Sequence, residues 1–199
     1  MAVNVLTGMP ASGKSTICKH LVKAFGYPVI EKDKLKEHLF DQIGFNSYQE
    51  KRRLDYAANA VVIQVVEQLL LADGSVIVDN NFDQPSGKVF SEMIAKYQPK
   101  CVTVFLKGDP EELYRRYALR DSTGSRHVGH AVQDHYPPLP GENPRYTMTR
   151  EEFEEKFFKR GMDYFTCPGA RLEVDTTDLD TVDVPGLIRQ IRACLEEAE

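Results

Sequence analysis

Eight consecutive residues near the amino terminus have the types and spacing of a phosphate-binding loop. Glycines let such a loop curl until its N–H groups point at phosphate oxygens, and the next helix adds the positive end of its dipole. Lys14 is expected to bridge the β- and γ-phosphates of ATP, and Ser15 to hold Mg²⁺. The residues of the loop are Gly8, Met9, Pro10, Ala11, Ser12, Gly13, Lys14 and Ser15. Thr16 follows the loop and is either a contact to the α-phosphate or an ordinary helix residue. The alternative is a plain glycine-rich turn.

A second acid follows a short apolar run, Val76-Ile77-Val78, and ends it at Asp79. Ligands of parallel sheets bind at the carboxyl ends of the strands. Asp79 is therefore predicted to accept a hydrogen bond from metal-bound water or from Ser15. A helix cap or a turn residue is the alternative for Asp79. Asn80 and Asn81 come next and are expected to donate hydrogen bonds to a substrate.

Asp33 is the candidate for a general base. A hydroxyl that attacks phosphorus needs a positioned carboxylate to take its proton, and we expect Asp33 at the end of the second strand. Its other reading is the N-cap of a helix that begins at Lys34. Lys36 lies about one helical turn further on and either holds an anionic group of the substrate or is an exposed lysine.

Arginines cluster where a predicted helix meets a long irregular segment. Arg116 and Arg120 share one helix face at i, i+4, and Arg126 lies beyond the helix end. Guanidinium groups so placed can clamp a transferring phosphoryl group, although a solvated helix face is the alternative. His127 and His130 lack further ligands for zinc, so phosphate contact, substrate contact or loop structure is expected of them.

Strands and helices alternate along the chain, which predicts a parallel sheet covered by helices on both faces. Strands are expected at Ala2–Leu6, from Pro28, at Ser75–Asn80, at Cys101–Leu106 and around Leu172–Asp175. Helices are expected at 13–25, around 35–40, and at 47–72, 85–97, 109–120 and 184–197.

The longest predicted helix carries specific expectations. Ser47 and Glu50 have the spacing of a capping box. Its apolar stripe is predicted to be Leu54, Ala58, Val61, Val65 and Leu69, and Gly74 is expected to end it in the left-handed conformation.

One stretch breaks the alternation. Residues 121–150 are rich in glycine, proline, serine, arginine and histidine and show little apolar periodicity. A segment of that length inside a domain is usually functional, which predicts a lid or a substrate-covering insertion. A disordered surface loop is the alternative.

Length and composition agree with one domain over residues 1–199. The chain is 42% hydrophobic with a formal net charge of −5, which disfavours a large polyanionic partner such as nucleic acid. Its four cysteines are isolated, and there is neither a signal peptide nor a run of about 18 apolar residues. We therefore predict a cytoplasmic protein with no membrane partner; the sequence gives no oligomeric state.

Together these motifs resemble the small P-loop kinases related to phage polynucleotide kinase, zeta toxin and chloramphenicol phosphotransferase. The matches are the Gly8–Ser15 loop, Asp33 with Lys36, Asp79-Asn80, the pair Arg116 and Arg120, and the string from Arg126 to His130. The resemblance implies a five-stranded parallel sheet, Asp33 as base, lid arginines on the phosphates, and adenine near Thr176. Lys36 stands where polynucleotide kinase has arginine, so the bidentate fork is lost.

The favoured function is an ATP- and Mg²⁺-dependent kinase for a hydroxyl of a small molecule, such as a nucleoside, a sugar nucleotide or an antibiotic. A polynucleotide 5′-hydroxyl kinase is the first alternative. The second is a regulatory NTPase whose output is a conformational change.

Overall fold

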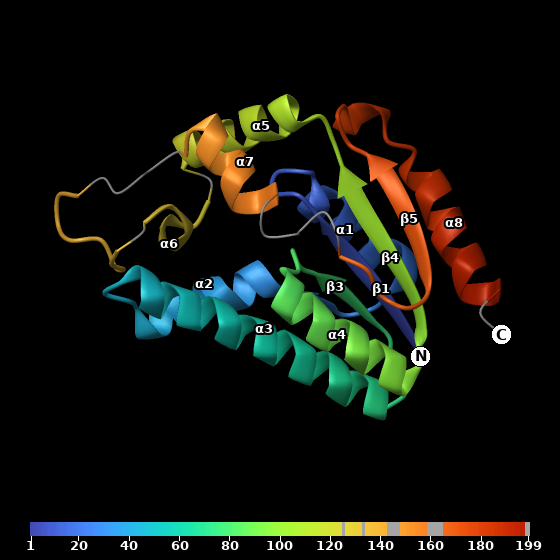
Figure 1. Cartoon of the computed structure of the whole chain (residues 1–199). Helices are drawn as coiled ribbons and strands as arrows, with labels where there is room; N and C mark the ends of the chain where they lie inside the picture. Colours follow the sequence, from blue (N-terminus) through green and yellow to red (C-terminus); the bar gives the residue numbers. More distant parts are fainter. Residues whose placement is uncertain (125, 133, 143–147, 159–164, 198–199) are drawn as a thin grey trace.

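Five parallel strands form one sheet in the order β2-β3-β1-β4-β5 (Figure 1). The computed structural model describes residues 1–124, 126–132, 134–142, 148–158 and 165–197. The strands are β1 (Ala2–Gly8), β2 (Val29–Glu31), β3 (Val76–Asp79), β4 (Lys100–Lys107) and β5 (Ala170–Asp175). The prediction of a five-stranded parallel sheet between helices is confirmed.

Helices cover both faces of this sheet. Figure 1 shows these helices around the sheet. Apolar side chains of α1 and α8 pack on one face, and those of α3 and α4 pack on the other. The helices are α1 (Lys14–Phe25), α2 (Lys32–Ile43), α3 (Tyr48–Leu71), α4 (Gln84–Tyr97), α5 (Pro110–Thr123), α6 (Val128–Ala131), α7 (Arg150–Phe158) and α8 (Val184–Glu197), with a 3₁₀ turn, η2, at Leu179–Thr181. The chain thus forms three layers, helix on sheet on helix.

The register of the strands brings the predicted site residues to one end of the sheet, where the strands have their carboxyl ends. Leu6 of β1 is in register with Asp79 of β3, which is in register with Glu31 of β2. The helices that follow β1 and β3 pack on opposite faces of the sheet. Adjacent strands whose connections diverge in this way leave a crevice beyond their carboxyl ends, where ligands of such sheets bind.

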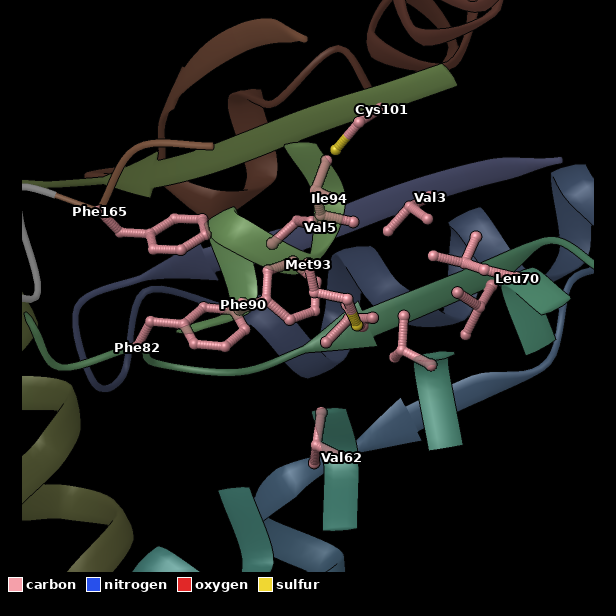
Figure 2. Packing of buried hydrophobic residues seen from close by; sticks show 13 residues of the cluster. Val3, Val5, Val62, Leu70, Phe82, Phe90, Met93, Ile94, Cys101 and Phe165 are labelled. Carbon is pink, nitrogen blue, oxygen red and sulfur yellow. The ribbon is translucent and has the colours of Figure 1, made fainter. Parts of the chain in front are cut away.

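An aromatic cluster anchors the chain just after β3. The ring of Phe82 stacks on Phe165 at 4.5 Å between centroids and lies 4.7 Å from the ring of Phe90 on α4. Figure 2 shows these rings beside Met93 and Ile94 of α4. Because Phe82 is buried, the short segment between Asp79 and α4 is held at the sheet edge.

Helix α3 begins as predicted but buries a different stripe. The Oγ of Ser47 accepts a hydrogen bond from the Glu50 N–H, which confirms the cap. Val61 and Val65 are exposed, whereas Val62 and Val66 are fully buried, so the predicted stripe was wrong by one residue over this stretch. The run from 61 to 66 is apolar on most sides of the helix, so the sheet and α4, rather than periodicity, select the buried face.

The end of α3 also differs from the prediction. The left-handed conformation falls on Asp73, with φ of 54°, and not on Gly74. By length and composition α3 would be long enough and apolar enough to cross a membrane. Its Val62, Val66 and Leu70 are packed into the core against the sheet and α4, as expected for a core helix of this fold.

The segment predicted to be irregular contains helices at both ends. Helix α5 continues to Thr123, and α7 begins at Arg150 and was not predicted. Within the expected lid, residues 125, 133 and 143–147 lie outside the described residues. Between them α6 packs near α2, where Phe40, Phe45 and Val132 form a small buried cluster.

Candidate functional site

A cleft of about 800 Å³ lies beyond the carboxyl ends of the central strands. In Figure 1 α5 and α7 lie on one side of this region and α2 on the other. The predicted site residues that line it are Pro10, Ala11, Gly13, Lys14, Ser15, Thr16, Asp33, Lys36, Asp79, Asn80, Asn81, Arg116, Arg120 and Arg126. Met9, Ser12 and Thr176 are instead buried, and Gly8 is part of β1 beneath the cleft. One cavity thus gathers segments that are far apart in the sequence.

The loop from Gly8 to Ser15 has the backbone of a tight anion cradle. Gly8, Ala11 and Gly13 all have positive φ, at 132°, 63° and 84°. A Cβ on Gly8 would lie 2.1 Å from the carbonyl oxygen of Leu106, so only glycine fits beside β4. Helix α1 then begins at Lys14 with its N-terminal amides at the cleft.

The ammonium group of Lys14 is held above this loop. Its Nζ donates to the carbonyl oxygens of Gly8 at 3.0 Å and Met9 at 2.8 Å. Burial lowers the Lys14 pKa to about 8, against the opposing charges of Asp79 and Asp33. An anion in the cleft would restore the pKa of this lysine, because opposite charge favours the ammonium form.

Asp79 and Ser15 supply hard oxygen atoms to the same cleft. Burial raises the pKa of Asp79 to about 6, and the nearby carboxylates Asp33 and Glu31 add to the rise although Lys14 opposes it. A carboxylate destabilised in this way gains from a divalent cation, and carboxylate and hydroxyl oxygens suit Mg²⁺. The donor set therefore fits the predicted magnesium.

Asp33 lies in the cleft but not at the end of a strand. Strand β2 ends at Glu31, and Asp33 is the second residue of α2. The N-cap of α2 is Glu31, so the alternative reading of Asp33 as a helix cap was also wrong. Strand β2 ends at Glu31, one residue after its apolar run, and α2 begins at Lys32, before the position near Asp33 where the strand was expected to end.

The carboxylate of Asp33 is held by lysines from its own helix. Its Oδ1 lies 3.2 Å from Lys36 Nζ and 3.9 Å from Lys32 Nζ. The side chain is 55% exposed, and partial desolvation inside the cleft opposes its ionisation, yet Lys36 and Lys32 bring the Asp33 pKa well below its usual value. Asp33 is thus a fixed anion at the cleft.

Asp55 of α3 completes this ion cluster and was missed from the sequence. Its Oδ1 accepts from Lys32 Nζ at 2.6 Å and from Lys36 Nζ at 3.1 Å, and its Oδ2 lies 3.8 Å from Arg52. The sequence held one signal, because Asp55, Asn59 and Val62 are spaced to share the buried face of α3. The wrong choice of stripe concealed it.

The two asparagines after β3 differ in their surroundings. Asn80 is buried, and its Nδ2 donates to the Oδ1 of Asn59 at 3.0 Å, so it ties β3 to α3. The Oδ1 atoms of Asn80 and Asn81 are both buried with no protein partner among the described residues. Both asparagines line the cleft, so each has an amide oxygen that can accept a hydrogen bond from a ligand.

The three arginines occupy different places. Arg116 donates to the carbonyl oxygens of Thr176 at 2.7 Å and Thr177 at 2.5 Å, so its fork holds the turn after β5. Arg120 lines the cleft, and burial followed by the charge of Arg126 lowers its pKa. Arg126 lies 3.4 Å from Asp121. The predicted pair at i, i+4 is thus divided, with Arg116 held at the turn and Arg120 beside Arg126.

His127 and His130 attach the segment after α5 to α2. The Nε2 of His127 lies 3.0 Å from Asp41 Oδ1, and that of His130 lies 3.0 Å from Glu37 Oε1. The Nδ1 of His127 also accepts from the Gly129 N–H and caps α6. No group of three or more metal-ligating side chains occurs in the described part of the chain. Of the roles considered for these histidines, loop structure is the one their contacts support.

Two lysines at the far end of the cleft were also missed. Lys51 of α3 donates to the carbonyl oxygens of His130 and Val132, and Lys156 of α7 lines the opposite side. Neither belongs to a short motif, and α7 was not predicted.

Comparison with known proteins shows what this chain resembles. A family model described as AAA domain matches residues 5–133. A cytidylate kinase of Pyrobaculum arsenaticum is 24% identical over 92% of this chain and 88% of its own. A shikimate kinase of Paracidovorax citrulli is 25% identical over 55% of this chain and 58% of its own.

Solved structures share the fold at low identity. A kinase candidate from Chloroflexus aurantiacus has a TM-score of 0.74 and 22% identity over 98% of both chains. A gluconokinase of Sinorhizobium meliloti has a TM-score of 0.54 and 16% identity, covering 98% of this chain and 92% of that one. A shikimate kinase of Bacteroides thetaiotaomicron has a TM-score of 0.53 and 17% identity over 98% of both chains. The chain has the α/β fold of P-loop kinases. None of these comparisons names polynucleotide kinase, zeta toxin or chloramphenicol phosphotransferase, so that finer resemblance stays a prediction.

Proposed function

The chain belongs to the AAA domain family, and from this membership and the cleft we propose an ATP-dependent kinase that phosphorylates a hydroxyl group of a small molecule. The observation that carries the proposal is the carboxylate of Asp33, fixed by Lys36 in the cleft that Lys14 also lines. A regulatory NTPase needs a phosphate-binding loop. It does not require an ionised carboxylate at the position where the acceptor of a phosphoryl group would bind.

In the proposed step Asp33 orients the acceptor hydroxyl and takes its proton. A bond forms between the acceptor oxygen and the γ-phosphorus as the bond from that phosphorus to the β–γ bridging oxygen breaks. The low pKa of Asp33 makes it a weak base, which suits a loose transition state in which the proton leaves late and positioning dominates.

The phosphate groups would lie on the Gly8–Ser15 loop, where the amides at the start of α1 and the Lys14 ammonium face the cleft. Ser15 and Asp79 would hold Mg²⁺ directly or through water. Magnesium, when bound, offsets the charge that develops on the phosphoryl oxygens.

We propose that Arg120 and Arg126 contact the transferring phosphoryl group, since both line the cleft beside Asp33. Arg116 would act indirectly, because its hydrogen bonds hold the turn at Thr176 and Thr177. We propose that the adenine of ATP binds beside this turn. Residues 1–199 would form one kinase domain in which the segment at about 121–150 covers the acceptor.

The relatives differ in the kind of molecule, given in their names, that would accept the phosphoryl group. The shikimate kinases and the gluconokinase are named for hydroxylated molecules, and the cytidylate kinase for a nucleotide. A phosphate acceptor is already anionic and needs no base. The Asp33 carboxylate therefore favours a hydroxyl acceptor for this chain.

The test is phosphotransfer by the purified chain with γ-labelled ATP and Mg²⁺. The panel would hold hydroxy acids, sugars, sugar phosphates, nucleosides, cytidine monophosphate and a 5′-hydroxyl oligonucleotide. A phosphate ester of a small molecule is the expected product. Formation of cytidine diphosphate, labelling of the oligonucleotide alone, or hydrolysis with no acceptor product would each overturn the proposal.

A further inference from the structure

The cleft carries two lysines that have no carboxylate within ion-pair distance among the described residues. They are Lys51 of α3 and Lys156 of α7, and they line it together with Arg126, which is paired with Asp121. In Figure 1 α7 lies at the top and α3 at the bottom of the view, with α6 to the left. The charges of Lys51, Lys156 and Arg126 thus act on one another within one cavity.

The carboxylates that line this region already have partners. Asp55 is bound by Lys32 and Lys36, and Glu37 is bound by His130 and Lys34. Asp33 is paired with Lys36. None of these acids lies within ion-pair distance of Lys51 or Lys156.

Lys51 is held by neutral groups only. Its Nζ donates to the carbonyl oxygens of His130 and Val132 and lies 5.6 Å from the centre of the Phe45 ring. Among the described residues Lys156 has no carboxylate partner, and its nearest aromatic contact is the ring of Phe157 at 5.9 Å. Two half-buried ammonium groups therefore face one cavity without a counter-ion from the described chain.

The electrostatic consequence is visible at Lys51. Burial lowers its pKa to about 7, and the positive charges of Lys156, Lys36 and Arg126 contribute further. The Lys156 pKa is lowered by burial and by Arg126, Lys36 and Arg52. Groups that disfavour one another's charge gain most when an anion is placed among them.

We propose that Lys51 and Lys156 bind an anionic group, a carboxylate or a phosphate, on the acceptor molecule. This inference rests on the proposed kinase function and narrows it to hydroxy acids and phosphorylated hydroxy compounds. It also reassigns the expected role of Lys36, since two carboxylates already neutralise that lysine and its task is to hold Asp33.

The first measurement does not depend on catalysis. The full chain, saturated with a non-hydrolysable ATP analogue and Mg²⁺, is acetylated briefly with acetic anhydride in the presence of inorganic phosphate, glycolate or neutral glycolamide. Mass spectrometry then reports each lysine. Phosphate or glycolate is expected to protect Lys51 and Lys156 in a saturable manner, and glycolamide is not. Lys88 is the internal control, because its side chain is 78% exposed on α4 and should react equally in every arm. The anion that protects at the lower concentration identifies the preferred group.

The second measurement compares acceptors in charged and neutral pairs, such as a hydroxy acid with its amide and a sugar phosphate with its sugar. The wild type should prefer the anionic member by about 30-fold or more in kcat/KM, mainly through KM. Lys51→Met and Lys156→Met should each reduce this preference by about 10-fold, whereas Lys51→Arg and Lys88→Met should keep it.

Equal protection by glycolamide, or an unchanged preference in both methionine variants, would overturn the anion site. If phosphate or glycolate protects both lysines but no acceptor is phosphorylated, the kinase proposal fails and the anion site stands. A loss of folding in Lys51→Met leaves Lys156→Met, on a different helix, to decide.

Discussion

Lys36 and Asp55 are joined by an ion pair between helices, with Nζ 3.1 Å from Oδ1. The same ammonium group lies 3.2 Å from Asp33, so a residue of α3 fixes the proposed base on α2 through one lysine. Asp55 touches neither the phosphate-binding loop nor Asp33 in the described contacts and is therefore a positioning residue. The relationship gives the first two predictions.

Replacing the proposed base should stop catalysis without stopping nucleotide binding. Asp33→Asn keeps the shape but cannot accept the proton, so kcat should fall by about 100-fold or more. The low pKa of Asp33 means that its charge also stabilises the fold, but the side chain is 55% exposed, so we expect a loss of only about 1 kcal/mol or less in urea unfolding. The affinity for an ATP analogue with Mg²⁺ is measured alongside. Asp134→Asn, whose side chain is 83% exposed, is the control. A variant with wild-type kcat would exclude Asp33 as the base.

Removing the acid that holds the lysines should cost stability as well as activity. Asp55→Asn leaves Lys32 and Lys36 close together with less counter-charge, and we expect a loss of about 2–4 kcal/mol in urea unfolding. The double variant Asp55→Asn with Lys32→Met should recover part of it, because one uncompensated charge is gone. No recovery in the double variant would show that packing, not charge, is responsible.

The same ion cluster predicts a pH dependence of stability. The lysines lower the folded-state pKa of Asp55 below its unfolded value of about 4. Its contribution is therefore fully present above that value and is lost as the pH falls towards the folded-state pKa. Asp55→Asn should flatten the acid limb of a plot of unfolding free energy against pH.

Nucleotide affinity should depend on the charge of Lys14. Its pKa of about 8 should rise when phosphates bind, so binding takes up protons near that pH. We expect affinity to weaken as the pH rises above about 8, by up to about tenfold per pH unit. Calorimetry in buffers of different ionisation enthalpy measures the uptake. Lys14→Met should bind weakly and without proton uptake.

The close approach at Gly8 should make this glycine irreplaceable. Gly8→Ala would put a Cβ 2.1 Å from the Leu106 carbonyl oxygen at φ of 132°, and we expect a loss of about 3 kcal/mol or more. Gly26 has φ of 67° with nothing within 4 Å of a built Cβ, so Gly26→Ala should lose only about 1 kcal/mol. Equal losses in urea unfolding would remove the steric explanation.

The histidine contacts should hold the outer wall of the cleft. His127→Ala removes one of two partners of Asp41, the other being Tyr136, and the cap of α6, so the Gly129 amide should exchange hydrogen faster. The KM of the acceptor should also rise, because Lys51 is bound to carbonyls of the same segment. His135 pairs with Glu142 outside this contact, so His135→Ala should leave both measurements unchanged.

Local chemistry made much of the site predictable. The Gly8–Ser15 spacing, the cap at Ser47 and the acid after Val78 depend on residues near one another, so their types reveal them. Most of the strands were found because each contains a short apolar run, whereas β5, Ala170–Asp175, alternates apolar and charged residues. Where apolar residues continue on all sides, as from Val61 to Val66, periodicity cannot choose the buried face.

The sequence by itself determined a parallel sheet between helices, with a phosphate-binding loop and one acid, Asp79, at the carboxyl end of a strand. Only the tertiary structure decided which ions meet: Asp55 with Lys36, His130 with Glu37, and Lys51 with two carbonyl oxygens. The reason is the distance along the chain between the residues that interact. Caps and loops follow from a few adjacent residues, whereas an ion pair between helices depends on how both pack against the sheet.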